Sequence, residues 1–537
     1  MNVLSKLGHY GRAVRATHAY LREPPWPNAE SRIREQLENR EQRWLDILER
    51  VVFSSPDHPY YQMFQLAGCS FGDVERCARR DGLEVTLTAL REAGVYLTHA
   101  EFKGHEPIVR QGRQIAAAGP DSFVNPLVSG GFETSSGGSR SKGVKTRSST
   151  AFRLYYEAYN ALSIREFGLL ERAHIEVKPV LPAGAGLGSV LGYSRLGLRV
   201  DRWFAVGGPM EDSAHYRALT NYLVAVARLH GVKAPFPTHL PANDFAPAAR
   251  WLADRKREGI GCSVGSYTSP AVRVAAAARD CGLDISGTQF FASGETLTDG
   301  KQELIESLGC EVRSRYHIAE VGPVGYGCRQ MRNGGCVHLF SDSLAVISCR
   351  RLAPLADVEV DSLHFTNLLD SAPYVLINAE MDDSGVLEPA RCDCVFSAAG
   401  FRTRIRDIAS FGKLTGQGMT LVGADVVQVL EKALPERFGG SPSDYQLVEA
   451  EVGDQTQLTL RASPRLKAAQ PEELKRFFLQ QVAACYGGSL ASRVWRHSDA
   501  LQVVSAEPFL TSSGKVLPLH LLRDAKSPKK HAAQTIS

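Results

Sequence analysis

The stretch between residues 261 and 312 constrains the fold most strongly, because strand-like and helix-like patterns alternate along it. Pro270 opens an Ala-rich segment at 272–281 that is typical of a helix. Residues 288–292 form a short apolar run that predicts a strand, and residues 301–308 return to helical spacing. Alternation of this kind indicates helices packed against a sheet, so we expect an α/β fold.

The chain also has to contain more than one domain, because its 537 residues exceed the roughly 250–300 at which a single core stops growing. Residues 411–423 carry four glycines and little helical periodicity, which indicates a hinge. Beyond it, predicted strands at 446–460 and 501–506 flank a predicted helix at 471–486. We therefore expect a large N-terminal domain over residues 1–411, a smaller α+β domain over 412–524 and a disordered tail over 525–537.

Composition narrows the class of protein. Hydrophobic residues make up 44% and charged residues 22% of the chain, as in globular proteins that bury a large core. The net charge of +4 is spread over 62 basic and 58 acidic residues, so nucleic acid is not an expected partner. No apolar stretch approaches about 18 residues and no signal block opens the chain, so we expect no membrane span and a cytoplasmic location. The eleven cysteines are then expected to be mostly buried thiols.

A Gly/Ser-rich stretch at residues 134–143 precedes a helix-like run at 152–167. Its backbone N–H groups, hydroxyls and terminal cations could together wrap a triphosphate. A flexible surface loop is the alternative, since Gly/Ser loops are common. The stretch is not the loop of P-loop proteins, because the pattern Gly-x-x-x-x-Gly-Lys-Ser/Thr is absent.

The same stretch resembles the phosphate loop of the adenylate-forming superfamily, whose usual form reads Ser-Ser-Gly-Thr-Thr-Gly-x-Pro-Lys-Gly. The matching residues are Ser135, Ser136, Gly137, Ser139, Lys142 and Gly143. The loop is one residue shorter than the usual form, and Ser141 stands in place of the proline. The resemblance implies that these residues bind the phosphates of ATP.

Two further motifs follow in the order that the superfamily has. Gly294 and Glu295 come directly after a predicted strand and resemble its Gly-Glu-Pro/Ala turn against the adenine, although an ordinary turn is the alternative. The stretch from Tyr316 to Gly322 resembles the motif Tyr-Gly-x-Thr/Ser-Glu-x-Gly, with His317 and Ala319 as departures. The resemblance implies that Tyr316 stacks on the adenine and that Glu320 holds Mg²⁺.

The C-terminal stretch from Pro508 to Lys515 resembles the superfamily's Pro-x-Thr-x-Ser-Gly-Lys loop. A lone lysine is usually solvated, but this resemblance implies a catalytic role for Lys515, whose ammonium would offset the charge of a carboxylate attacking the α-phosphate. The matches cover roughly residues 120–520, and their order is far more specific than any one of them. The implied fold is a large adenylate-forming domain with a smaller, mobile α+β domain.

Within the superfamily, the chain resembles the phenylacetate–CoA ligase branch at residues 54–61, 320–323 and 392–394. Where relatives have Arg-Tyr-Arg-Thr-Gly-Asp, this chain has residues 377–383, so Asp382 or Asp383 would supply the ribose-binding carboxylate. Gly412 and Lys413 would stand for the hinge pair Gly-Arg.

The branch also implies a metal site. Cys328, His338, Cys392 and Cys394 match positions that it often fills with cysteine and histidine. Three thiolates and one imidazole suit a tetrahedral structural Zn²⁺ ion. Buried thiols near a turn are the alternative, and Cys336 is a competing ligand.

A glycine-rich stretch at residues 184–189 can be compared with the dinucleotide-binding motif. Neither register completes Gly-x-Gly-x-x-Gly, and no acidic residue follows at the required distance in a βαβ context. We therefore interpret this stretch as a loop.

The resemblance implies an AMP-forming ligase that uses ATP and Mg²⁺ to activate a small-molecule carboxylic acid as an acyl-adenylate. In the phenylacetate branch the acyl group then passes to CoA. Three alternatives stay open: transfer to an amine or a carrier protein, activation of an unusual acid such as nitrite, and a non-catalytic binding protein that kept the fold.

Overall fold

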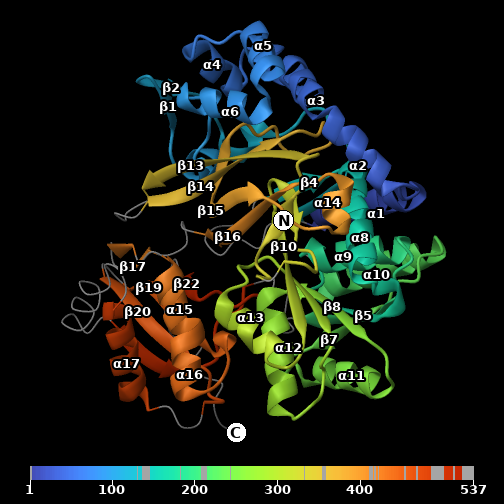
Figure 1. Ribbon diagram of the computed structural model, residues 1–537, viewed down its shortest axis with the longest axis vertical. Helices are drawn as coiled ribbons and strands as arrows, with labels where there is room; N and C mark the ends of the chain where they lie inside the picture. Colours follow the sequence, from blue (N-terminus) through green and yellow to red (C-terminus); the bar gives the residue numbers. More distant parts are fainter. Residues whose placement is uncertain are drawn as a thin grey trace.

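A computed structural model describes most of the chain (Figure 1). The described residues are 3–129, 131–135, 145–181, 183–206, 214–241, 244–331, 333–352, 359–410, 415–416, 419–420, 423–452, 455–466, 470–484, 501–511 and 514–522.

A mixed sheet of twelve strands forms the centre of the molecule, which confirms the predicted α/β fold. Its strands follow the order β13-β14-β15-β16-β12-β11-β10-β9-β8-β5-β6-β7. One half is parallel and consists of β5 (Ala173–Val177), β6 (Val200–Val206), β7 (Pro237–Leu240), β8 (Cys262–Tyr267), β9 (Gln289–Ser293) and β10 (Glu311–Ile318). The other half is antiparallel and consists of β11 (Gly322–Tyr326), β12 (Val337–Leu339), β13 (Leu344–Leu352), β14 (Glu359–Asn367), β15 (Ala379–Pro389) and β16 (Thr403–Ser410).

The parallel strands are buried on both faces because helices cover them, as expected for a parallel sheet. Every residue of β8 and β9 is buried. The covering helices are α8 (Thr150–Phe167), α9 (Gly184–Arg195), α10 (Ala214–Leu229), α11 (Ala246–Arg257), α12 (Thr268–Asp280) and α13 (Asp299–Glu306). The helices predicted at 272–281 and 301–308 and the strand at 288–292 are thus α12, α13 and β9.

The stretch at 184–189 that we interpreted as a loop is instead the start of helix α9, so that interpretation was wrong. Its glycines serve packing, because a Cβ on Gly186 would lie 2.3 Å from the Pro179 carbonyl oxygen and 2.8 Å from the Trp203 ring. The absence of a side chain lets the helix approach β6 closely, and this tertiary contact outweighs the low helix propensity of glycine.

The N-terminal helices are α1 (Val3–Arg22), α2 (Ala29–Glu38), α3 (Arg40–Ile47), η1 (Leu48–Phe53), α4 (Pro59–Leu66), α5 (Phe71–Asp81), α6 (Leu83–Glu92) and α7 (His99–Lys103). Two short hairpins and three short helices complete the large part: β1 (Ile108–Arg110), β2 (Arg113–Ile115), β3 (Phe132–Ser135), β4 (Lys145–Ser148), η2 (Gly119–Phe123), η3 (Leu169–Glu171) and α14 (Val395–Ala399). Of the N-terminal helices, α3 to α7 pack with the antiparallel half of the sheet, whereas α1 contacts α8 and α10 and α2 contacts α8 and α14 (Figure 1). None of the described helices is both long and apolar enough to cross a membrane.

A smaller C-terminal unit has its own four-stranded sheet, in the order β21-β20-β19-β22, and its own apolar core. It contains α15 (Gly423–Gln428), η4 (Val429–Ala433), α16 (Leu434–Phe438), η5 (Pro442–Asp444), β19 (Tyr445–Val452), β20 (Gln455–Ala462), α17 (Pro471–Ala484), β21 (Leu501–Ser505) and β22 (Leu519–Leu522). Only β17 (Thr415–Gly416) and β18 (Met419–Thr420) are described within the predicted hinge and before α15. Gly412, Lys413 and the tail over 525–537 lie outside the described residues, and the domain boundaries stay predictions.

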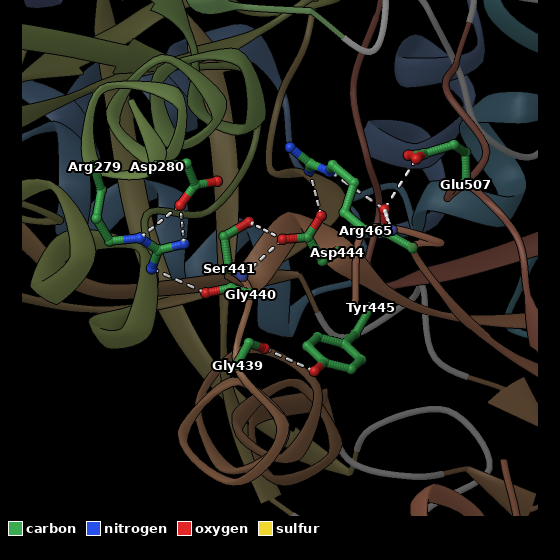
Figure 2. Close-up of polar contacts among 10 residues, drawn as sticks. Arg279, Asp280, Gly439, Gly440, Ser441, Asp444, Tyr445, Arg465 and Glu507 are labelled. Carbon is green, nitrogen blue, oxygen red and sulfur yellow. Dashed lines mark hydrogen bonds and ion pairs between the residues drawn. The ribbon is translucent and has the colours of Figure 1, made fainter. Parts of the chain in front are cut away.

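The small unit contacts the large one through polar groups (Figure 2). Arg279, at the end of α12, donates to the Gly440 carbonyl oxygen at 3.0 Å. That glycine belongs to a turn with φ of +87°, which the Asp444 carboxylate closes by accepting the Ser441 N–H at 2.7 Å. Arg465 pairs with the same carboxylate. The turn is therefore held rigidly where it meets α12.

Candidate functional site

Lys515 lies at the end of a tight turn in the small unit. An antiparallel bridge between Leu510 and Val516 closes this turn. The Thr511 N–H donates to the Lys515 carbonyl at 2.9 Å, and the Lys515 N–H donates to the Thr511 hydroxyl at 3.1 Å. Gly514 has a φ of +77°, a left-handed conformation that glycine adopts without strain. The local geometry thus aims the Lys515 side chain out of the turn.

The Lys515 ammonium reaches the turn that follows β9 in the large unit. Its Nζ donates to the Gly294 carbonyl oxygen at 2.8 Å and lies 4.6 Å from the centroid of the Tyr267 ring. Gly294 has a φ of +75°, and a Cβ there would lie 2.8 Å from both Lys515 and Tyr267. Only glycine fits this position. Two motifs that the sequence separates by 221 positions are therefore in direct contact.

Glu295 follows Gly294 directly and is half-buried, and its side chain binds protein groups. The Ser269 hydroxyl hydrogen-bonds with the Glu295 carboxylate and also receives the Val516 N–H at 3.2 Å. Burial raises the pKa of Glu295, while Lys301 and Lys515 act in the opposite direction. In this arrangement Glu295 positions the Lys515 turn through Ser269. Sequence reasoning missed Ser269 and Tyr267, although both belong to the strand-to-helix junction after β8.

Tyr316 and the two candidate ribose carboxylates come together from distant strands. The Tyr316 hydroxyl donates to Asp383 Oδ2 at 2.7 Å. Asp382 is 2.9 Å from His99 Nδ1 and has a φ of +60°, a backbone conformation that is uncommon outside glycine. Asp383 is therefore the carboxylate next to the predicted adenine-stacking ring, and Asp382 faces α7.

Glu320 forms a buried ion pair instead of standing free. Lys103 Nζ, at the end of α7, lies 2.5 Å from Glu320 Oε1, and both side chains are at most 12% exposed. A carboxylate is a suitable ligand for Mg²⁺, but here an ammonium already neutralises it. Glu320 could hold Mg²⁺ only after Lys103 moved away. Nothing in the sequence pattern marked Lys103, which is 217 positions from its partner.

The predicted phosphate loop lies between two paired strands. Strands β3 and β4 form an antiparallel hairpin in which Ser135 is opposite Lys145. Ser136, Gly137, Ser139 and Lys142 lie outside the described residues. Directly after β4, the Ser149 hydroxyl caps α8 by accepting the Phe152 N–H at 3.1 Å. After this stretch the described chain runs through β4 into α8, which corresponds to the helix predicted at 152–167.

Cys328, His338, Cys392 and Cys394 come together as one cluster, with all ligand atoms within 4.8 Å of one another. The Sγ atoms of Cys328 and Cys394 lie 3.9 Å and 3.8 Å from that of Cys392. Tetrahedral zinc with Zn–S bonds of about 2.3 Å requires S···S separations of about 3.8 Å, so the set fits the ion. Cys336, the competing candidate, is not part of the cluster.

Groups around the cluster orient its ligands. His338 Nδ1 lies 2.9 Å from the Phe401 carbonyl oxygen, so Nδ1 carries the proton and Nε2 faces the sulfurs at 3.2–3.3 Å. The Glu166 carboxylate accepts the N–H groups of Arg329 at 3.0 Å and of Val395 at 2.9 Å. It thereby joins the two loops that carry the cysteines. Such outer contacts are typical of metal sites.

No known family model matches the sequence, and no curated protein does. Among solved structures, the chain is similar to a 2-hydroxyisobutyryl-CoA ligase in complex with 2-HIB-AMP and CoA, at 15% identity and a TM-score of 0.44 over 91% of this chain and 89% of that one. It is similar to a structure of McyG A-PCP complexed with phenylalanyl-adenylate, at 13% identity and a TM-score of 0.40, over 83% of this chain and 63% of that one. It is also similar to R195K MenE of E. coli with bound OSB-AMS, at 10% identity and a TM-score of 0.32, over 66% of this chain and 62% of that one.

Proposed function

We propose that this protein is an ATP-dependent, AMP-forming ligase that activates a carboxylic acid as an acyl-adenylate. The observation that carries the proposal is the contact of Lys515 with Gly294 and Tyr267 across the two units. A cation delivered from a separate unit onto a glycine turn can enter and leave the site as the unit moves. The motifs of Gly294 and Lys515 both resemble those of the adenylate-forming superfamily, which supports a role of this movement in adenylation.

In the proposed first step, an oxygen of the substrate carboxylate attacks the α-phosphorus of ATP. The bond from the α-phosphorus to the bridging oxygen breaks, and pyrophosphate leaves. Two anions must approach each other in this step, so a fixed positive charge stabilises the transition state more than the bound reactants. Lys515 supplies that charge once the incoming reactants replace its contact with the Gly294 carbonyl.

The nucleotide would lie between the Gly294 turn and Tyr316. The ring of Tyr316 is half-buried, and its hydroxyl is fixed on Asp383 at 2.7 Å, so the ring presents an oriented face for adenine. Asp383 could also accept a ribose hydroxyl, with Asp382 as the neighbouring alternative. We propose the loop over residues 134–143 as the phosphate site and Glu320 as the carboxylate for Mg²⁺, after Lys103 has turned away.

We further propose CoA as the acceptor of the acyl group. Its thiol sulfur would attack the acyl carbon of the adenylate, AMP would leave and a thioester would form, while the thiol proton passes to solvent. The resemblance to the phenylacetate–CoA ligase branch supports CoA. Transfer to an amine or a carrier protein, and activation of nitrite, would share the first step and differ in the product.

The Cys/His cluster supports a structural Zn²⁺ ion, which is our second proposal. The cluster lies in the loops around Cys328 and Cys394, and the fixed tautomer of His338 leaves Nε2 to bind the metal. When bound, zinc would crosslink β12, the loop after β11 and the loop before α14. It has no part in the adenylation step.

ATP–pyrophosphate exchange over a broad acid panel tests the proposed function. We expect exchange with at least one acid, and a loss of about 10²–10³-fold in Lys515→Ala, as for other single preorganised charges. Lys432→Ala is the matched control, because Lys432 also reaches the large unit from the small one, at Glu303, but is 40% exposed. A non-catalytic binding protein would bind ATP and show no exchange with any acid. Equal activity of the two variants would contradict the role of Lys515.

A further inference from the structure

A second group of buried charges lies behind Tyr316. Residues Arg315 and Tyr316 are consecutive in β10, so their side chains point to opposite faces of the sheet. On the Arg315 face, β5 and the residue after it contribute Glu176 and Lys178. Lys178 Nζ lies 2.9 Å from Glu176 Oε2 and donates to the Ser189 hydroxyl at 2.7 Å. We call Glu176, Lys178 and Arg315 the cation cluster.

The cation cluster carries an excess of positive charge. Among the described residues, Glu176 is the only carboxylate that acts electrostatically on either Lys178 or Arg315. Lys178 and Arg315 are each 6% exposed, and burial lowers the pKa of both. Two cations therefore share one carboxylate in a region with little water. His174 Nε2 also lies 3.2 Å from the Glu176 carboxylate.

Arg315 has no carboxylate partner of its own within the described part of the chain. It donates to the Ser163 hydroxyl at 2.9 Å, and its guanidinium lies 4.5 Å from the Phe291 ring and 4.8 Å from the Tyr326 ring. Its Nε has no hydrogen-bond partner among the residues that the structure describes. Aromatic faces offset part of the cost of burying a cation, but an unpaired buried charge remains expensive.

Arg195, elsewhere in the large unit, differs from Arg315 because it is directly paired with a carboxylate. Arg195 is 4% exposed, and its Nε lies 2.6 Å from Glu157 Oε1. At Arg195 the fold thus places a carboxylate beside the buried guanidinium. At Arg315 the direct contacts among the described residues are a hydroxyl and aromatic rings, and Nε is left to donate to an anion.

The cation cluster adjoins the proposed active site. Arg315 is opposite Ser293 in the register of β9 and β10, and Ser293 directly precedes the Gly294 whose carbonyl binds Lys515. The residues around the cluster are only half-buried at Ser189 and His317, so a ligand could reach it. Burial lowers the pKa of His317 to about 3, so this imidazole stays neutral and adds no charge.

We propose that the acid activated by this protein carries a second anionic group, which Arg315 and Lys178 bind while the reacting carboxylate lies at Lys515. The inference rests on the proposed function and names its substrate class. A second carboxylate or a phosphonate meets the requirement equally, since both offer oxygen acceptors to a guanidinium and an ammonium.

The first test is ATP–pyrophosphate exchange with pairs of acids that differ only in the distal group. The pairs are succinate and butyrate, glutarate and valerate, adipate and caproate, and 3-phosphonopropionate and butyrate. In at least one pair we expect kcat/KM for the dianionic acid to exceed that of its partner by about 10-fold or more, the value of one charged hydrogen bond. A consistent preference for the monoanionic acids would overturn the inference and leave the proposed function standing.

Arg315→Met then assigns the preference to this residue. We expect kcat/KM for the dianionic acid to fall by about 10- to 100-fold, with a change of less than about 3-fold for its monoanionic partner. Arg315→Lys should recover part of the preference. Arg195→Met, the matched buried control, should reduce thermal stability and leave the preference unchanged, because it removes a structural pair.

A thermal-shift measurement without ATP separates the two proposals. The preferred dianionic acid should raise the Tm of the wild-type protein and not that of Arg315→Met. If Arg315→Met loses exchange with every acid equally while folded, Arg315 is a positioning residue and the inference is wrong. If no acid supports exchange in the wild-type protein, the proposed function itself fails.

Discussion

The ion pair between Lys301 and Glu431 allows a sharp test of how the two units are held together. Lys301 lies in α13 of the large unit and Glu431 in η4 of the small one, with Nζ 2.9 Å from Oε1 and exposures of 3% and 2%. Thr298 also donates to the Glu431 carboxylate. Burial by itself would lower the pKa of Lys301, but the Glu431 and Glu295 carboxylates raise it above its ordinary value. The lysine is therefore charged and depends on its partner.

Removing one partner of a buried ion pair typically costs about 3–5 kcal/mol, because the other charge stays buried. In Glu431→Gln the amide oxygen can still accept a hydrogen bond from Lys301. We therefore expect a cost at the lower end of this range, about 3 kcal/mol. The protein can avoid this cost by separating the two units, which hydrates Lys301. At 1.4 kcal/mol per factor of ten, the population with Lys515 on Gly294 should fall by up to about 10²-fold.

Amide hydrogen exchange measures this population without a substrate. The Val516 N–H donates to Ser269 across the interface, so its protection reports docking directly. We expect faster exchange at Val516 in Glu431→Gln. The double variant Lys301→Met/Glu431→Met should recover protection, since an apolar pair of similar volume often replaces a buried ion pair without loss.

Glu303→Gln is the control for this experiment. Glu303 pairs with Lys432 across the same interface at 2.9 Å, but the two side chains are 57% and 40% exposed. A pair of this kind contributes about 0–1 kcal/mol, so exchange at Val516 should change little. Loss of protection in the double variant as large as in Glu431→Gln would refute the reasoning, because it would mean that the interface needs the charges themselves.

Two further predictions concern the large unit. Protein purified without added metal should contain about one zinc ion per chain; Cys394→Ser should lose the ion and unfold at a lower temperature, whereas Cys336→Ser should retain it, because Cys336 is buried outside the cluster. Burial raises the pKa of Asp342 to about 7, so the unfolded chain releases this proton at lower pH than the folded one. Denaturant titrations should therefore show a free energy of unfolding that falls between about pH 4 and pH 7, by up to about 4 kcal/mol, and a much smaller fall in Asp342→Asn.

Local patterns of the sequence predicted the α/β class and the elements between residues 261 and 312. The Ala-rich run at 272–281 and the apolar run at 288–292 correspond to α12 and β9 because their periodicity follows from which side chains the sheet buries. The helix α9 could not be predicted in this way. Its glycines argue against a helix locally, and the reason for them is Trp203 on a strand that follows in the sequence.

The sequence motifs of the candidate site could be identified from the sequence, but the contacts between their side chains could not. The resemblance grouped Gly294, Tyr316 and Lys515, and these residues do lie around one turn and the strand beside it. It gave no sign that Lys103 neutralises Glu320 or that Ser269 links Glu295 to the Lys515 turn. Such pairs depend on three-dimensional proximity between elements hundreds of positions apart, which periodicity and spacing do not encode.

Two buried cations near the site, Lys301 and Arg315, differ in what pairs with them. In our proposal, one pairs with the other unit and the other with the substrate. Lys301 forms its ion pair with a carboxylate of the other unit, so this pair is present in the same arrangement in which Lys515 reaches Gly294. Arg315 shares the Glu176 carboxylate with Lys178, so in our proposal its charge is fully paired only when the substrate is bound. A buried cation that is only partly paired disfavours the empty site, and a dianionic acid removes that penalty on the face of the sheet behind Tyr316. The two effects can be measured independently: Glu431→Gln should weaken docking for every acid alike, whereas Arg315→Met should change the choice of acid and leave Val516 protected.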